Sequence, residues 1–233
     1  MVAMSDQTDP RQEIVRAILS KGAMKVSIEK PFRWASGYAM PIYVDNRCLI
    51  GYPEVRGAIA DAFSKKIKDS GIKYDAIAGV ATGAIPHATT LADKLGLPLL
   101  YIRPKPKDHG IGRQVEGDLP GGFAGKNILV IEDTISTGGS SVKAVEAMRT
   151  EGGIVSTCAA IYFHDLPGNE NPFEKMNPSC TLETLVTFPY LLETAREMKL
   201  LDHNTIEELE AWYKDPFVWG ENHGMPREEN SKA

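Results

Sequence analysis

The chain has 233 residues and a formal net charge of −5, with 42% hydrophobic and 24% charged residues. This balance is typical of a globular domain, and its acidity argues against nonspecific binding to nucleic acid or to an anionic membrane surface. No run approaches the roughly 18 apolar residues of a membrane span, and the first residues lack the pattern of a signal peptide. We therefore expect a cytoplasmic protein with neither a nucleic-acid nor a membrane partner.

The first 71 residues contain two helix signals with a different element between them. The dipeptide Asp9–Pro10 predicts a helix start, and this helix is expected to end near Gly22. A second helix is predicted from Pro53 to Gly71. Residues 22–52 follow neither pattern and are expected to form a small strand-and-loop element, here called the hood.

The middle of the chain alternates between short apolar strands and helices. Strands are predicted at 74–81, 98–103, 127–133 and 154–163. Helices are predicted at 87–96 and 140–153. This alternation indicates an α/β fold with a doubly wound parallel sheet covered on both faces, whose core spans 72–165. Helices follow over 189–220, where Asn204 is expected to cap a helix that Pro216 ends. The whole chain, 1–233, is interpreted as a single domain.

The sequence offers no metal-binding pattern. The three cysteines form no CxxC pair, and the five histidines are scattered. We expect free, buried thiols of a reducing compartment at Cys48, Cys158 and Cys180.

Residues 104–126 link two predicted strands and are longer than most loops. The segment is rich in charged side chains, namely Lys105, Lys107, Asp108, His109 and Arg113. Gly110 and Gly112 supply hinges beside this cluster. The pattern favours a catalytic lid over a solvated surface loop.

The stretch ILVIEDTISTGGSS, residues 128–141, places two carboxylates, Glu132 and Asp133, after an apolar run. A turn of hydroxyls and glycines follows, made of Ser136, Thr137, Gly138, Gly139 and Ser140. The turn enters a helix at the carboxyl end of a strand, where ligands of parallel sheets bind, and it presents backbone N–H groups to an anion. The absence of GK[ST] and of GxGxxG excludes the two common nucleotide loops. We therefore predict a phosphate cradle beside carboxylates that accept ribose hydroxyls, rather than a solvated acid pair before a helix cap.

These motifs resemble those of the type I phosphoribosyltransferases. VIEDTISTGGS (130–140) is similar to the ribose-phosphate motif of that family. RPKPKDHGIGRQVEG (103–117) resembles the lid of its orotate-specific members. GVATGAIPHATTLADKLGLPLLYIR (79–103) resembles their pyrophosphate loop with its strand and helix. WASGYAMPIYVDNRCLIGYPEVR (34–56) resembles their hood.

The resemblance implies transfer of 5-phosphoribose from phosphoribosyl pyrophosphate to orotate, a step of pyrimidine biosynthesis that gives orotidine 5′-monophosphate and pyrophosphate. It implies Mg²⁺ held mainly by the substrate, with no direct protein ligand, and a homodimer in which one lid closes over the partner's site. The catalytic residues would be Lys107, His109 and Asp133, and Ser136 would lie beside orotate. Phosphoribosyl pyrophosphate would contact Arg103, Lys107, His109, Glu132, Asp133, Thr134, Ile135, Ser136, Thr137, Gly138, Gly139 and Ser140, with backbone groups of residues 81–84 at its pyrophosphate.

Recognition of orotate departs from the family pattern. Many members have a lysine before the Ser-Gly of the hood and another after the strand-terminal arginine, whereas this chain has Ala35 and Pro104. We expect backbone groups at Ser36 and Gly37, together with a stacked Tyr43, to bind orotate instead.

Two alternatives stay open. The chain could serve another base, such as a purine, or could be a non-catalytic regulator that senses phosphoribosyl pyrophosphate. The intact acid pair and cationic lid favour catalysis on orotate. Of the histidines, His87 is expected at the surface or as a helix cap, and His164 with Asp165 as a loop pair.

Overall fold

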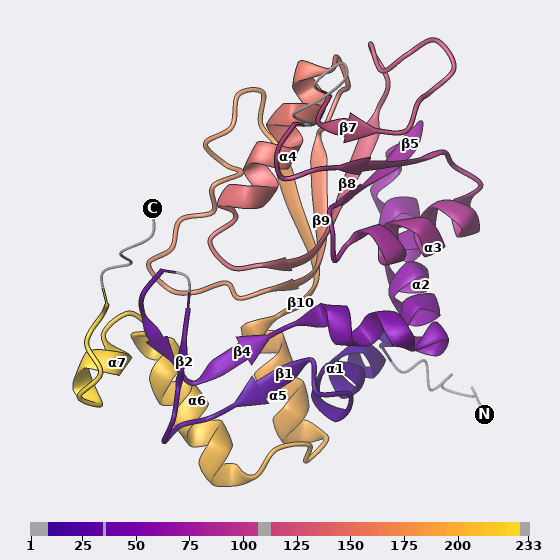
Figure 1. Ribbon diagram of the computed structural model, residues 1–233. Coiled ribbons are helices and arrows are strands. Elements are labelled where there is room, and N and C mark those ends of the chain that lie inside the picture. The colour runs from indigo at the N-terminus through magenta and orange to yellow at the C-terminus, as the bar shows by residue number, and fades with distance from the viewer. Residues whose placement is uncertain (1–8, 35, 107–112, 229–233) are drawn as a thin grey trace, which may run out of the picture.

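The computed structural model describes residues 9–34, 36–106 and 113–228. Its core is one sheet with the strand order β10-β9-β8-β5-β6-β7 (Figure 1). Five strands are mutually parallel: β5 (Ala76–Val80), β6 (Leu99–Ile102), β8 (Ile128–Ile135), β9 (Thr157–Phe163) and β10 (Thr181–Thr187). The short β7 (Val115–Glu116) pairs antiparallel with β6. The predicted doubly wound α/β fold is confirmed.

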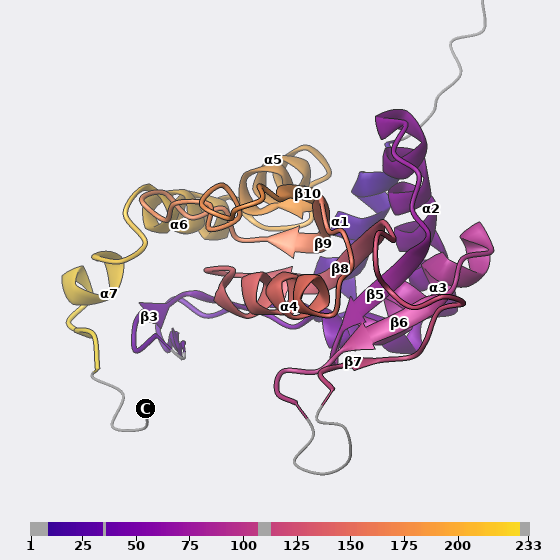
Figure 2. The same ribbon diagram turned by 90° about the horizontal axis from the view of Figure 1, so that it is seen from above.

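Helices cover both faces of the sheet, as parallel strands require. Helix α3 (Ile85–Leu95) follows β5, and α4 (Gly139–Thr150) follows β8 toward the opposite edge. The connections from β5 to β6 and from β8 to β9 run toward opposite edges of the sheet, and right-handed crossovers therefore place α3 and α4 on opposite faces. Helix α2 (Pro53–Ser70) packs beside α3 (Figure 2). Every residue of β5 and β9 is consequently buried.

The residues that were predicted to begin and end the helices do so in the structure. Asp9 caps α1 (Pro10–Ser20) by accepting a hydrogen bond from the Arg11 N–H, and Pro10 occupies its first turn. Helix α2 ends at Gly71 and α3 at Gly96, both in the left-handed conformation that glycine adopts without strain.

The hood consists of two antiparallel pairs and a 3-10 helix. Its elements are β1 (Met24–Val26), β4 (Ile42–Val44), β2 (Phe32–Arg33), β3 (Ala39–Met40) and η1 (Asn46–Gly51). The C-terminal helices α5 (Phe188–Glu197), α6 (His203–Lys214) and α7 (Trp219–Asn222) lie beside it (Figure 1). Trp212 is fully buried and donates its indole N–H to the sulfur of Met40 at 3.3 Å, so α6 anchors the hood.

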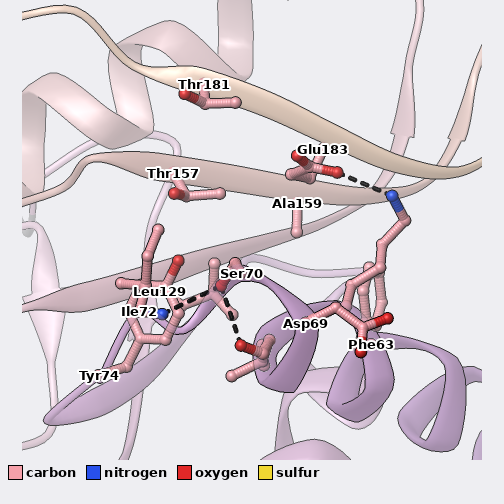
Figure 3. Close-up of a pocket in the computed structure, with 12 residues that line it drawn as sticks. Phe63, Asp69, Ser70, Ile72, Tyr74, Leu129, Thr157, Ala159, Thr181 and Glu183 are labelled. Carbon is pink, nitrogen blue, oxygen red and sulfur yellow. Dashed lines mark hydrogen bonds and ion pairs between the residues drawn. The ribbon is translucent and has the colours of Figure 1, made fainter.

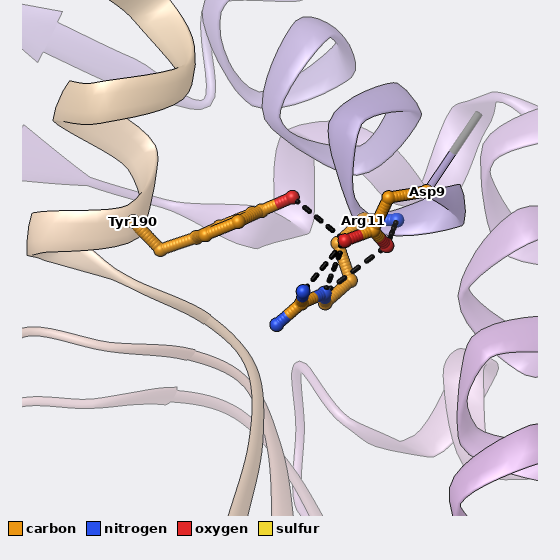
Figure 4. A network of polar contacts seen from close by, with 3 residues as sticks. All are labelled: Asp9, Arg11 and Tyr190. Carbon is orange, nitrogen blue, oxygen red and sulfur yellow. Dashed lines mark hydrogen bonds and ion pairs between the residues drawn. The ribbon is translucent and has the colours of Figure 1, made fainter.

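A polar network joins the start of α1 to α5 (Figure 4). The Arg11 guanidinium contacts the Asp9 carboxylate at 2.6 Å and lies 4.4 Å from the centre of the Tyr190 ring. The Tyr190 hydroxyl donates to the same carboxylate at 3.1 Å. These bonds hold the pKa of Asp9 below its usual value, chiefly through Arg11. Helix α1 is thereby tied to α5.

Several details differ from the prediction. Strand β10 was not predicted, and β8 continues through Ile135 instead of ending at the acid pair. Asp202, rather than Asn204, caps α6, because its carboxylate accepts from the Thr205 N–H at 2.9 Å. Cys48 is exposed, so the prediction of a buried thiol was wrong there, whereas the other two cysteines are buried and all three are free.

Within the described ranges, no helix combines the length and the apolar character needed to cross a membrane.

Two glycines in ordinary backbone conformations have opposite packing. A Cβ added at Gly79 in β5 would lie 2.9 Å from the Cβ of Ala88 in α3, whereas one added at Gly57 in α2 would meet nothing within 4 Å. We expect Gly79→Ala to destabilise the fold by about 1–3 kcal/mol through overpacking, and Gly57→Ala to stabilise it by about 0.5–1 kcal/mol. Urea unfolding of both variants measures this contrast. An unchanged midpoint for Gly79→Ala would show that β5 and α3 are not in direct contact.

Candidate active site

The carboxyl ends of β5, β6, β8 and β9 meet at one edge of the sheet, because these strands are parallel neighbours. This edge brings together loop 81–84 after β5, Arg103 after β6, the acid pair near the end of β8 with the turn that follows it, and His164 after β9. The edge therefore gathers the segments that the sequence indicated as substrate-binding.

The two carboxylates of the acid pair have different surroundings. Glu132 is buried, with 6% of its surface exposed, and its carboxylate accepts from the Ser141 hydroxyl at 2.9 Å and from the Asp133 N–H at 3.0 Å. Burial, and next the neighbouring Asp133 carboxylate, raise the pKa of Glu132 well above its usual value. Glu132 thus ties β8 to the first turn of α4, a contact that the sequence motif did not indicate.

Asp133 faces the loop that follows β5. A Cβ added at Gly83 would lie 2.1 Å from an Asp133 carboxylate oxygen and 3.1 Å from the Cγ atom of Arg47. Loop 81–84, the Asp133 side chain and the stem of Arg47 therefore meet at one point. Buried Asn46 fixes the backbone there, donating to the Asp133 carbonyl at 2.9 Å and to the Thr134 hydroxyl at 3.0 Å.

The turn after the acid pair enters α4 at Gly139, one residue before the predicted start. Gly138 has φ +79°, and a Cβ there would lie 2.6 Å from the Pro172 ring. Glycine is required at this position for both reasons. The N–H groups of the first helical turn have no intrahelical partner, so they and the hydroxyls of Thr137 and Ser140 are available to an anion. Ile135 is buried and its carbonyl accepts from the His164 N–H at 3.0 Å.

A pocket of about 290 Å³ lies between this strand end and the hood. It is lined by Arg33, Trp34, Ser36, Tyr43, Val44, Thr134, Ser136, Thr137 and His164. The pocket joins three of the residues expected to contact orotate, Ser36, Tyr43 and Ser136. Gly37 is not among the lining residues. Its backbone is also engaged, because its N–H donates to the Trp34 carbonyl at 2.8 Å and its carbonyl accepts from the Glu228 N–H at 3.0 Å.

The two histidines singled out in the sequence are both buried. His164 follows β9 in a loop, as expected, but it lines the pocket, with 3% of its surface exposed and its ring 4.6 Å from that of Trp34. Burial lowers the pKa of His164 to about 4. His87 is buried inside the fold rather than exposed, and burial lowers its pKa to about 4 as well. Neither ring carries a positive charge at neutral pH. Single-sequence patterns missed both because burial depends on the hood and on α2.

Arg103 is half-buried and its guanidinium lies 3.4 Å from the Glu116 carboxylate of β7. The predicted catalytic residues Lys107 and His109 lie outside the described residues, as does Ala35 of the hood. Among the residues that are described, no group of three His, Cys, Asp or Glu side chains could hold a metal ion by itself.

Another hollow lies toward the amino ends of the strands, between α2 and β8, β9 and β10 (Figure 3). Phe63 and Ser70 line it from the helix, and Thr157 and Thr181 from the strands, while Lys66 and Glu183 form an ion pair of 2.7 Å across it. None of the predicted site residues lines this hollow, so the pocket at the carboxyl edge is the candidate active site.

Comparison with known proteins identifies the family of the chain. A family model described as the phosphoribosyl transferase domain matches residues 52–178, which is more than half of the chain. The fold and the strand-end turn thus define a phosphoribosyltransferase.

Relatives narrow the class. The chain is 42% identical over 214 residues to an orotate phosphoribosyltransferase of Enterococcus faecalis, covering 91% of this chain and 99% of the relative. A relative of the same name from Listeria innocua is 41% identical, with 90% and 98% covered. The crystal structure of orotate phosphoribosyltransferase from Aeropyrum pernix superposes with a TM-score of 0.67 at 29% identity, covering 79% of this chain and 98% of that one. The chain belongs to the orotate phosphoribosyltransferase family.

The raised pKa of Glu132 has a consequence for stability. The pKa of this carboxyl group is higher in the folded state than its usual value of 4.5. The folded state of the wild type therefore loses stability as the pH rises through the folded pKa. Glu132→Gln removes this titration while its amide can still bond Ser141 and the Asp133 N–H. We expect the melting temperature of the variant, relative to wild type, to rise by at least about 2 °C between about pH 5 and pH 8.

The matched control is Glu146→Gln on the exposed side of α4, which should show no such trend. A difference between Glu132→Gln and wild type that is independent of pH would contradict a raised pKa at Glu132.

Proposed function

We propose that the pocket at the carboxyl edge transfers 5-phosphoribose from phosphoribosyl pyrophosphate to orotate, giving orotidine 5′-monophosphate and pyrophosphate. The observation that carries this proposal is the position of Asp133, whose carboxylate meets the loop that follows β5 and whose strand leads directly into the turn that enters α4. The family membership of the chain supports the same reaction.

The turn from Ser136 to Ser140 would hold the 5′-phosphate. Its free N–H groups and hydroxyls are donors, and the positive end of the α4 dipole adds to their attraction. Gly138 and Gly139 allow the backbone to approach the phosphate closely. Thr134 supports this turn through Asn46, whereas Ile135 packs in the core.

The two acids would have different roles. Asp133 accepts hydrogen bonds from the ribose hydroxyls, and its negative charge stabilises the cation that develops on the sugar as the anomeric C–O bond breaks. Glu132 is bonded inward to Ser141 and contributes by fixing the turn. Both acids remain part of the phosphoribosyl site, but with a direct role for Asp133 and an indirect one for Glu132.

The base would lie in the pocket between strand and hood. Ser136 and Ser36 offer hydroxyl groups, and Tyr43, with 39% of its surface exposed beside Phe32, offers a ring face for stacking. The backbone of Gly37 is already engaged, so it is not expected to bind orotate.

Mg²⁺ fits this arrangement as a companion of the substrate. The carboxylate of Asp133 is the hard oxygen donor that Mg²⁺ prefers, but a single carboxylate does not form a cage, so pyrophosphate and ribose oxygens would supply most ligands. Bound in this way, Mg²⁺ would neutralise the charge of the leaving pyrophosphate.

The pyrophosphate itself would bind to backbone groups of loop 81–84 and to Arg103, Lys107 and His109. We propose further that the chain forms a homodimer in which residues 104–126 of one subunit cover the site of the other. A segment of this length can span tens of ångströms when extended, which makes the crossing sterically feasible.

The direct test is loss of orotate absorbance on adding phosphoribosyl pyrophosphate and Mg²⁺. Consumption of orotate, with no consumption of adenine, guanine or hypoxanthine, supports the proposal. Consumption of a purine alone would replace orotate by another base. Binding of phosphoribosyl pyrophosphate without turnover of any base would indicate a sensor of that compound.

Asp133→Asn keeps the shape of the side chain and removes its charge. We expect turnover to fall about ten- to a thousand-fold, equivalent to roughly 1.4–4 kcal/mol, with little change in melting temperature. Wild-type turnover would remove the assigned role.

The same variant tests the shared site. If the lid acts on the partner, mixing inactive Lys107→Ala and Asp133→Asn dimers under subunit exchange gives heterodimers with one intact site and one doubly defective site. Half of the dimers are then mixed, so activity should approach about a quarter of wild type. No recovery in a sample shown to contain heterodimers would place the lid over its own subunit.

A further inference from the structure

Orotate carries a carboxylate on its pyrimidine ring, and binding it in a pocket requires a compensating cation or several hydrogen-bond donors. Of the described residues that line the base pocket, Arg33 is the one with a permanent positive charge. His164 also lines the pocket, but burial lowers its pKa to about 4 and it is neutral at neutral pH. Gly37, which could have offered a backbone donor, has its N–H occupied by the Trp34 carbonyl.

The Arg33 side chain is held in place by the C-terminal segment 225–228. One terminal nitrogen donates to the Gly37 carbonyl at 3.1 Å and to the Pro226 carbonyl at 2.7 Å. The other terminal nitrogen lies 3.0 Å from the Glu228 carboxylate. A guanidinium with these contacts has a fixed plane and position, and it retains donors for a second carboxylate.

Segment 225–228 also packs closely against the hood turn that contains Ser36 and Gly37. The Glu228 N–H donates to the Gly37 carbonyl at 3.0 Å, and a Cβ added at Gly37 would lie 2.0 Å from the Glu228 carbonyl oxygen. Arg227 donates to the Ser36 carbonyl at 3.1 Å, with its guanidinium 4.8 Å from the centre of the Tyr38 ring. The same turn thus carries the pocket residue Ser36 on one side and the C-terminal segment on the other.

We propose that Arg33 is the residue that recognises the carboxylate of orotate, and that Glu228 weakens this recognition by placing a negative charge on the same guanidinium. The inference rests on the proposed function, since it takes orotate as the base. Arg33 acts by direct contact with the substrate. Glu228 acts through Arg33 and is a positioning residue whose charge opposes that of the incoming carboxylate.

The two residues give opposite predictions. Arg33→Gln removes the cation, so the orotate KM should rise about 10- to 100-fold while the KM of phosphoribosyl pyrophosphate stays within about threefold. Glu228→Gln keeps the shape and removes the competing charge, so the orotate KM should fall. If Arg33 only ties the C-terminal segment to the hood, both variants break the same ion pair, and both should shift the KM in the same direction.

A neutral substrate analogue separates charge from packing. Orotamide, the 6-carboxamide of the same ring, is measured as an inhibitor competing with orotate. The wild type should bind orotate much better than orotamide, Arg33→Gln should lose this preference, and Arg33→Lys should keep part of it. Arg227→Gln is the matched control, because it removes an arginine that touches the hood turn but does not line the pocket; it should keep the preference for orotate.

The outcomes are distinguishable from failure of the proposed function. If the wild type does not consume orotate, the proposed function is wrong. If the wild type consumes orotate, and folded Arg33→Gln retains both the orotate KM and the preference over orotamide, then Arg33 does not bind the carboxylate and only this inference is overturned. Equal loss of the preference in Arg33→Gln and Arg227→Gln would likewise overturn it. Circular dichroism melting establishes that the variants are folded, and Arg33→Lys supplies the test of charge if Arg33→Gln is not.

Discussion

The hydrogen bond from the Ser141 hydroxyl to the buried Glu132 carboxylate is the contact on which the site depends. It spans the turn from the end of β8 to the first turn of α4, and the second carboxylate oxygen accepts the Asp133 N–H. A buried carboxyl group is costly unless it is bonded in this way. Its burial therefore fixes the turn that presents N–H groups at the α4 terminus, and it leaves Asp133 as the acid that faces the loop after β5.

The hood completes the site from the other side through contacts between distant parts of the chain. Asn46 donates to the backbone and to a side chain at the end of β8, and Trp212 of α6 donates to the sulfur of Met40. Arg33 donates to the Pro226 carbonyl of the C-terminal segment. The pocket thus lies between the end of β8 and an element supported by the last helices.

The sequence predicted the features that depend on local chemistry. Strand and helix alternation, helix ends at Gly71 and Gly96, and the glycine-containing turn into α4 all follow from residue type and spacing, and the structure has each of them. Features that depend on tertiary burial were missed. Strand β10 is only half-buried and lacks a strong apolar pattern, the inward turn of Glu132 requires its Ser141 partner, and the environment of His164 is created by Trp34 of the hood.

The proposed roles of the two acids, direct for Asp133 and indirect for Glu132, are tested most directly by a crystal structure with orotidine 5′-monophosphate bound. We expect the phosphate among residues 136–140, the Asp133 carboxylate within hydrogen-bond distance of a ribose hydroxyl, and Glu132 still bonded to Ser141. A Glu132 carboxylate that leaves Ser141 to bind the ribose, or a phosphate bound away from the α4 turn, would contradict this proposal.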